Sequence, residues 1–401
     1  MNLPPPLPLA EAQERLLAQV GPLGVESVPT ERAAGRYLAR QLLAARTHPA
    51  ADLSAMDGYA VRADDLSGPW RVVGESAAGH PFDEKLVRGE AIRISTGAIM
   101  PDGNGVVLLQ ENATRDSDAL RLNGEGEPSA RHIRRAGFDF RAGDPVLQPG
   151  TRIGPGQLAL ALAAGHGELP VGRLPSLAIL DSGDELAADP AACELHQIPA
   201  SNGAMLLAMA APHTSSLLPL GPVPDRLSTM LAALDNAADT DVIVTSGGAS
   251  VGDHDLVRPA LERWGATIGF WRVAMRPGKP LLVARKGRQW VLGLPGNPVS
   301  SYVTAFLFLL PLLRALGGAT DPLPRPLAMP LGEPLGATGG RTEFVRARLG
   351  PSGLLPIAER DSSALRALAS ADALIERPAG APAAQSGTIL RAYWLENGGM
   401  A

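Results

Sequence analysis

The stretch DVIVTSGGASVGDHD (residues 241–255) decides the fold, because a short apolar run stops there at a turn of small residues and acids. Val242, Ile243 and Val244 are β-branched at successive positions, so both faces of the predicted strand should be covered, as in a parallel sheet between helices. The following loop is rich in glycines and hydroxyls, namely Gly247, Gly248, Gly252, Thr245, Ser246 and Ser250. Its backbone amides can turn toward a polar ligand, although a plain strand-to-helix turn is the alternative.

Two acids, Asp253 and Asp255, lie just before a segment with helical spacing, LVRPALERW (residues 256–264). One of them can serve as the N-cap of this predicted helix. The other carboxylate is then left over, and two carboxylates beside hydroxyls suit a hard cation such as Mg²⁺. The same loop therefore predicts a ligand site and a candidate metal site.

Composition limits the classes of protein to which the chain can belong. With 401 residues and 45% apolar content, two to four domains with ample core are expected. A net charge of −5 argues against a general surface for nucleic acid or anionic lipid. A single cysteine, Cys193, excludes a disulfide framework and any cysteine-cluster metal site, and fits a reducing, cytoplasmic setting.

Two segments bear on membrane targeting. The N-terminal segment has no basic region and its apolar residues are broken by prolines, so no signal peptide is expected. The longest apolar run, residues 299–313, has fifteen residues and is too short to span a bilayer. We predict a buried core helix and no membrane partner.

The first part of the chain changes texture twice. Residues 9–20 and 30–45 are amphipathic and predict helices, the second capped by Thr30, and residues 154–165 predict another helix. Between them the chain is glycine-rich with short β-prone runs. We predict a discontinuous, elongated helical linker domain (residues 1–46 and 145–174) into which a small β-rich domain (residues 47–144) is inserted.

Strands and helices alternate in residues 175–320, which predicts a doubly wound α/β domain with a mainly parallel sheet. Ser201 and Asp225 are expected to cap two of its helices. Ligands of such sheets lie beyond the carboxyl ends of the strands, so the polar loops 181–185, 245–255 and 295–298 should share one edge. The remaining residues, 321–401, predict a small C-terminal β domain.

Charged clusters stand near these loops. Arg272, Arg276 and Lys279 lie within eight residues, around the turn MRPGKP, and predict a pocket for phosphate or another tetrahedral oxyanion, with a solvated basic turn as the alternative. A second basic cluster precedes Gly137 and Asp139 and holds Arg131, Arg134 and Arg135. Asp181, Asp184 and Glu185 follow a predicted buried strand, so at least one carboxylate should lie at the sheet edge.

Seven motifs occur in one order along the chain: SAMDGYAVR (54–62), RISTGAIMP (93–101), RRAGFD (134–139), SGDEL (182–186), TSGGASVGDHD (245–255), RPGKP (276–280) and GLPGNPVS (293–300). Together they resemble the molybdopterin molybdenumtransferase family, which includes the bacterial MoeA proteins and the gephyrin E domains. The resemblance covers nearly the whole chain. It implies insertion of molybdenum from molybdate into adenylated molybdopterin, with Mg²⁺-dependent hydrolysis of the adenylate.

The resemblance also implies roles for single residues. Those expected in catalysis are Asp57, Thr96, Glu185, Asp255, Arg276 and Lys279, with Glu185 and Asp255 as metal ligands. Those expected to bind the molybdopterin substrate are Arg134, Asp139, Arg272, Pro295 and Pro298, joined by Ser246, Gly247, Gly248 and Ser250 of the loop. It further implies a homodimer, with the SAMDGYA domain of one chain facing the α/β domain of the other, and a molybdopterin adenylyltransferase upstream.

The chain departs from the family pattern at a few positions. Arg272 and Arg276 stand where bacterial relatives often carry lysine, and Asp181 stands where a small residue is usual. Residues 103–105 are Gly-Asn-Gly in place of the frequent Gly-Ala-Asp. Two alternatives to the implied activity are a molybdopterin adenylyltransferase-like enzyme, whose chain lacks the SAMDGYA domain, and a molybdopterin-binding scaffold without catalysis.

Overall fold

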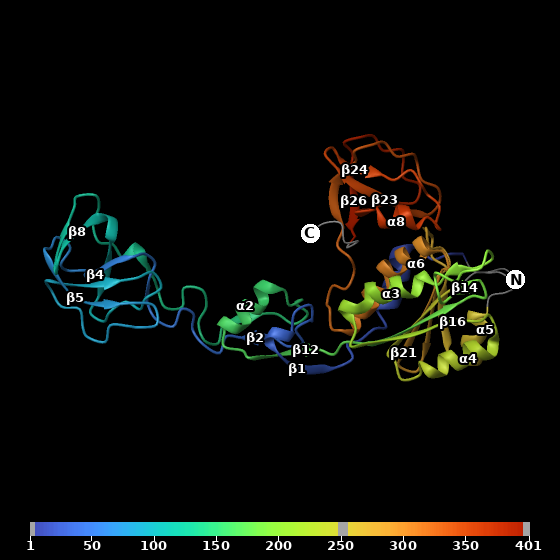
Figure 1. Ribbon diagram of the computed structural model, residues 1–401, viewed down its shortest axis with the longest axis horizontal. Coiled ribbons are helices and arrows are strands. Elements are labelled where there is room, and N and C mark those ends of the chain that lie inside the picture. Colours follow the sequence, from blue (N-terminus) through green and yellow to red (C-terminus); the bar gives the residue numbers. More distant parts are fainter. Residues whose placement is uncertain (1–4, 248–255, 396–401) are drawn as a thin grey trace.

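The chain is elongated in the computed structural model, which describes residues 5–247 and 256–395 (Figure 1). The small β domain lies at one end and a slender linker region follows it. The α/β domain lies at the other end, with the C-terminal β domain above it. The multi-domain fold expected from the sequence, an α/β domain with smaller β domains, is confirmed.

A six-stranded sheet in the order β16-β13-β17-β21-β20-β18 forms the centre of the α/β domain. Its strands are β13 (Ser176–Ser182), β16 (Ser216–Val223), β17 (Val242–Ser246), β18 (Thr267–Trp271), β20 (Leu282–Lys286) and β21 (Gln289–Leu294). The first four strands in this order pair in parallel, and β20 and β18 pair antiparallel at one edge. The carboxyl ends of β13, β17 and β21 therefore lie side by side.

Helices cover both faces of this sheet. The helices are α3 (Ser201–Ala210), α4 (Leu227–Asn236), α5 (Val257–Arg263), α6 (Pro298–Thr304) and α7 (Leu310–Leu316). Leu177 and Ile179 of β13 join the core on the α3 and α6 side, whereas Ala178 and Leu180 join the core with α4 and α5. Val242 to Val244 are fully buried, as the sequence predicted.

The two predicted helix caps are wrong. Ser201 is the first helical residue of α3, whose N-cap position is Ala200, and the cap comes instead from the strand residue Asp181. Asp225 precedes Arg226, the N-cap residue of α4. A cap that comes from a strand rather than from the residue before the helix leaves no local pattern in the sequence.

The predicted core helix is confirmed. The segment Pro298–Leu316, formed by α6, the π-helical turn η5 (Ala305–Leu309) and α7, has 19 residues and is apolar enough to cross a membrane. However, 94% of its apolar window is buried inside the protein. Helix α1 (Leu9–Leu17) packs in the same core through Ala12 and Leu16, although it belongs to the N-terminal part of the chain.

The linker region is less helical than predicted. It contains α2 (Pro155–Ala163) and two antiparallel strand pairs, β1 (Val25–Pro29) with β12 (Glu168–Gly172) and β2 (Leu42–Leu43) with β11 (Pro145–Leu147). The helix predicted for residues 30–45 is wrong, since only the short 3₁₀ turn η1 (Thr30–Arg32) is helical. The Thr30 hydroxyl donates a hydrogen bond to the His166 carbonyl. The backbone of this segment forms bridges to residues 152 and 171 instead of the internal hydrogen bonds of a helix.

The linker meets the α/β domain through two glycines. A side chain on Gly172 would place its Cβ 2.0 Å from the carbonyl oxygen of Gly317, at the end of α7. Gly172 also ends β12, and its amide donates to the Tyr37 carbonyl. The backbones therefore touch directly, with no side chain between them.

The β domain contains the six-stranded sheet β7-β4-β6-β5-β9-β8. Its strands are β4 (Gly58–Arg62), β5 (Trp70–Ser76), β6 (Glu90–Ile94), β7 (Gly105–Leu109), β8 (Ala113–Asp116) and β9 (Ala119–Leu122). A separate short pair is formed by β3 (Leu53–Ser54) and β10 (Ile133–Arg134). The domain also contains the 3₁₀ turns η2 (Gln110–Asn112) and η3 (Ala130–His132). The β-prone runs of the sequence are thus strands.

The C-terminal domain has the sheet order β19-β23-β25-β26-β22. Its strands are β22 (Leu327–Pro330), β23 (Thr342–Gly350), β24 (Gly353–Pro356), β25 (Ala373–Arg377) and β26 (Ile389–Trp394), with the helix α8 (Leu365–Ala369). The edge strand β19 (Met275–Arg276) comes from the basic turn of the α/β domain and pairs with β23. The basic turn is therefore fixed between two domains.

Candidate active site

A cleft of about 1450 Å³ opens where the carboxyl ends of β13, β17 and β21 meet the C-terminal domain. The α/β side of its lining includes Asp181, Ser182, Glu185, Asn202, Ser246, Gly247, Arg276, Lys279, Pro295, Asn297 and Pro298. The C-terminal domain contributes Arg341, Glu343, Arg346, Arg360, Asp361 and Ser362, among others. The described parts of the three polar loops therefore share one edge, as the sequence predicted.

Hydrogen bonds tie these loops together. Asn202, at the start of α3, donates to the Ser246 hydroxyl (3.0 Å) and to the Gly296 carbonyl (2.7 Å), so it joins the ends of β17 and β21. Gly247 has a positive φ of 98°, and a Cβ there would lie 2.5 Å from the Ser182 carbonyl. Only glycine fits this turn without strain, which explains the residue type.

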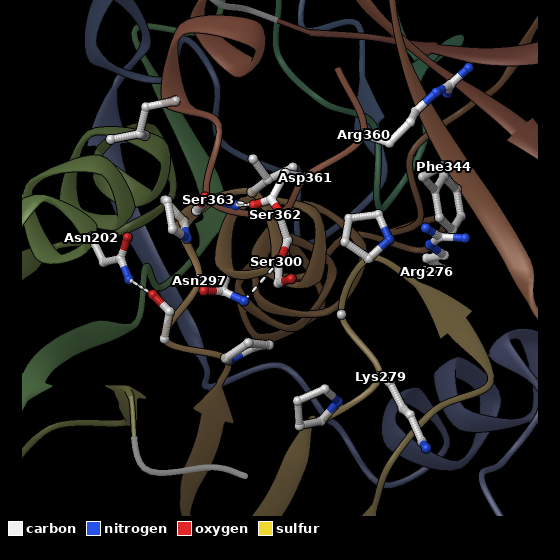
Figure 2. A pocket seen from close by; sticks show the side chains of 18 of the residues that line it. Asn202, Arg276, Lys279, Asn297, Ser300, Phe344, Arg360, Asp361, Ser362 and Ser363 are labelled. Carbon is white, nitrogen blue, oxygen red and sulfur yellow. Dashed lines mark hydrogen bonds between the residues drawn. The ribbon is translucent and has the colours of Figure 1, made fainter. Parts of the chain in front are cut away.

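Cations line one side of the cleft. Figure 2 shows Arg276, Lys279 and Arg360 on one side and Asn202 on the other. Arg276 lies 3.8 Å from the Glu343 carboxylate, a loose ion pair, and the Lys279 side chain has no ion-pair partner among the described residues. The pKa of Arg360 is lowered, mainly by burial and also by the positive charge of Arg276, and the Glu343 carboxylate offsets part of this effect. The arrangement suits an anionic ligand, which could neutralise these charges.

The turn that carries the first two cations packs on α6. Gly278 has a φ of 101°, and a Cβ at this position would meet the Thr304 methyl at 2.6 Å. Lys279 accepts a backbone hydrogen bond from Val273 (3.0 Å). The backbone that holds Arg276 and Lys279 is thus fixed, although both side chains are exposed.

The C-terminal half of the cleft was not predicted from the sequence. Buried Arg346 donates to the carbonyls of Ala364, Glu359 and Asp361, and so shapes the loop that carries Arg360. Asn297 donates to the Ser362 hydroxyl (2.9 Å) across the domain boundary, as Figure 2 shows. No sequence pattern marks these residues, because their contacts depend on how two domains pack.

The acids of the cleft differ in burial. Glu185 is exposed at the edge, where it can reach a ligand or a cation. Asp181 is only 7% exposed, and burial raises the pKa of its carboxyl, an effect partly offset by the hydrogen bond from the Gly203 amide and by the neighbouring Ser246 hydroxyl. Within residues 5–247 and 256–395, no three His, Cys, Asp or Glu side chains gather as a metal cluster.

The site residues predicted in the β domain lie at the other end of the chain (Figure 1). Asp57 accepts hydrogen bonds from the Thr96 amide (2.6 Å) and hydroxyl (3.0 Å), which together lower the pKa of its carboxyl. Arg134 and Asp139 are exposed on the same domain. One chain therefore brings Asp57 and Thr96 together but does not bring them to the cleft.

Other predicted residues are also placed. Pro295 and Pro298 bracket the turn before α6 and line the cleft. Arg272 is not among the described residues that line the cleft. Its guanidinium lies 5.8 Å from the Trp271 ring centroid. The predicted residues Gly248, Ser250 and Asp255 lie outside the described residues.

Family models match three successive parts of the chain. Residues 7–165 match the model described as "MoeA N-terminal region (domain I and II)". Residues 178–315 match "Probable molybdopterin binding domain", and residues 328–394 match "MoeA C-terminal region (domain IV)". The middle match covers the α/β domain that provides one side of the cleft.

Similar proteins have the same organisation over nearly their full length. The molybdopterin molybdenumtransferase of Bacillus subtilis is 32% identical, covering 98% of this chain and 95% of the relative. Molybdopterin molybdenumtransferase 2 of Mycobacterium tuberculosis (strain ATCC 25618 / H37Rv) is 34% identical, covering 92% and 95%. The solved molybdopterin biosynthesis moeA protein of Pyrococcus horikoshii OT3 aligns with a TM-score of 0.83 and 25% identity over 98% of this chain and 100% of that one. The chain belongs to the molybdopterin molybdenumtransferase family, and its role lies in molybdenum cofactor biosynthesis.

Proposed function

We propose that the protein inserts molybdenum from molybdate into adenylated molybdopterin, with Mg²⁺-dependent hydrolysis of the adenylate to release AMP. The observation that carries this proposal is the cleft at the carboxyl edge of the α/β sheet, which Arg276, Lys279 and Glu185 all line. An adenylate and molybdate are both anions, and the cleft offers cations beside a carboxylate.

The cations have separate parts in this proposal. Arg276 presents planar, paired donors to an oxyanion, which would displace its loose contact with Glu343. Lys279 supplies a compact charge to the same anion. Their positive charges stabilise the negative charge that develops on the phosphate oxygens during hydrolysis.

The carboxylates fit a magnesium ion held mainly by substrate. Mg²⁺ usually takes one or two protein carboxylates together with phosphate oxygens and water, so the exposed Glu185 and a second acid are a sufficient donor set. Asp255, outside the described residues, is the proposed second ligand. When bound, the ion neutralises phosphate charge and orients water for attack on the adenylate.

A homodimer with a shared site is the second part of the proposal. Asp57, Thr96, Arg134 and Asp139 lie far from the cleft of their own chain, so a second copy must bring them there if they act in the reaction. Phe138, beside Asp139, is 75% exposed, so this side chain is accessible to a second copy. We place the reaction in the cytoplasm, downstream of a molybdopterin adenylyltransferase.

Release of AMP tests the proposal directly. Purified protein is incubated with adenylated molybdopterin, molybdate and Mg²⁺, and AMP and molybdenum cofactor are measured. Release that requires both molybdate and Mg²⁺ supports the proposal. Binding of the substrate without release would indicate a molybdopterin-binding scaffold, and adenylation of molybdopterin from ATP would indicate an adenylyltransferase. Either outcome would overturn the proposed reaction.

A further inference from the structure

Asp181 fits where it does because two glycines, Gly203 and Gly221, have no side chains to clash with it. It is the second-to-last residue of β13, at an irregularity in the pairing with β16. Its Oδ2 accepts a hydrogen bond from the Gly203 amide (2.8 Å) in the first turn of α3. A Cβ on Gly203 would lie 2.3 Å from this oxygen, and one on Gly221 would lie 2.6 Å from the Asp181 carbonyl. One carboxyl oxygen therefore has a structural role as the cap of α3.

The second oxygen has no such role. Asp181 Oδ1 is buried and forms no hydrogen bond within the described part of the chain. Within residues 5–247 and 256–395, the groups that interact with the carboxyl are uncharged: the Gly203 amide from α3 and the Ser246 hydroxyl from β17. Burial without a cationic partner raises its pKa, because the ionised form loses its hydration.

Ser246 is the neighbouring side chain through which Asp181 can influence a ligand in the cleft. The two residues are register partners in the parallel pair β13 and β17, and both line the cleft. Ser246 Oγ already accepts a hydrogen bond from Asn202, so its own hydrogen remains to be donated. It can point to the Asp181 carboxylate or to a ligand, but not to both.

We propose that the Asp181 carboxyl donates its proton to Ser246 Oγ and thereby leaves the Ser246 hydroxyl free to donate to a tetrahedral oxyanion in the cleft. When Asp181 loses that proton, the Ser246 hydroxyl turns to the carboxylate, and the new negative charge repels the anion. Asp181 is thus a positioning residue that acts through Ser246. This role rests on the proposed function, because the oxyanion is molybdate or a substrate phosphate.

The test measures molybdate affinity of the full-length protein by calorimetry over the whole pH range in which the protein stays folded. For the unmodified protein we expect affinity to fall as pH rises through the titration of Asp181, by at least about tenfold. Asp181→Asn keeps the cap and donates permanently to Ser246, so its affinity should stay high and flat across the range. Asp184→Asn, which removes an exposed carboxylate three residues away, is the matched control and should retain the slope.

Ser246→Ala separates the hydrogen bond from the effect of charge alone. Without the hydroxyl, affinity at low pH should fall about tenfold, the value of one hydrogen bond to a charged group. The same pH slope in Asp181→Asn as in the unmodified protein would overturn the role of Asp181 only. If neither molybdate nor AMP binds the unmodified protein at any pH, both this role and the proposed function are wrong. Thermal unfolding of each variant confirms that it is folded.

Discussion

The cleft and the outer β domain carry the two halves of one motif set, yet they are built differently. In the cleft, Lys279 is a cation without an ion-pair partner among the described residues, and the lining comes from two domains. In the β domain, Asp57 already accepts two hydrogen bonds from Thr96 on an exposed surface. The cleft has the form of a ligand site, whereas the β domain presents a preformed surface element. Motifs adjacent in a family pattern can thus lie far apart in one chain.

The largest expected effect tests the cleft itself. Lys279→Ala should lower the rate of AMP release between about 100- and 1000-fold, because one charge that stabilises the reacting anion is lost. The rate is measured with adenylated molybdopterin, molybdate and Mg²⁺ in excess. Lys85→Ala is the control, since Lys85 makes an exposed 3.8 Å contact with Asp102 in the β domain. An unchanged rate for Lys279→Ala would remove the cleft from the reaction.

The second prediction concerns the joint between the two regions. His213 is 7% exposed, and burial together with Arg314 and Arg152 lowers its pKa from 6.5 to about 4. The unfolded chain therefore binds a proton more readily, so the free energy of unfolding should fall as pH drops from 6.5 toward 4, by up to about 3 kcal/mol. Urea unfolding at a series of pH values measures this loss.

His213→Gln has no imidazole to protonate, so its acid limb should be flatter than that of the unmodified protein by the same amount. His196→Gln provides the control, because the His196 side chain is 71% exposed. Parallel acid limbs for His213→Gln and the unmodified protein would contradict the assignment.

The third prediction asks whether the two halves meet between chains. Asp57→Asn and Lys279→Ala chains should each be inactive alone, but mixed dimers should contain one intact site in two. With half of the dimers mixed, about one quarter of the normal rate should return. The rate of AMP release after joint refolding of the two variants measures this recovery. No recovery in verified mixed dimers would mean that the two residues do not share a site across chains.

The smallest effect concerns how the cleft is closed. Ser362→Ala removes the hydrogen bond from Asn297 that connects the α/β domain to the C-terminal loop. The bond is exposed, so its loss should lower the free energy of unfolding by less than about 1 kcal/mol. Urea unfolding measures the change, with Ser386→Ala as a control within the C-terminal domain alone. A loss above about 3 kcal/mol would show that this contact holds the domains together.

The sequence predicted the sheet well because its signals are local. Successive apolar residues at 242–244 indicate burial on both faces, and the structure confirms it. The helix predicted for residues 30–45 failed because the segment pairs with residues about 120 positions away, and long-range pairing overrides a helical pattern. Arg346 and Arg360 were missed for the same reason, since packing between domains brings them to the cleft.

The site was predictable to the extent that strand ends carry it. Glu185, Ser246 and Pro295 follow or end predicted parallel strands, and the structure brings them to one edge. The place of Asp181 was not predictable, because its environment depends on Gly203 and Gly221 from two other elements. A charged residue at a strand end gives no sign of whether it is solvated or enclosed.

The direct backbone contact between Gly172 and Gly317 sets the angle between the linker region and the α/β domain. Even a methyl group at position 172 would push the two backbones apart, and a small rotation there would displace the distant end of the β domain by a much larger distance. A mutation that changes no ligand contact could therefore shift the β domain out of its position.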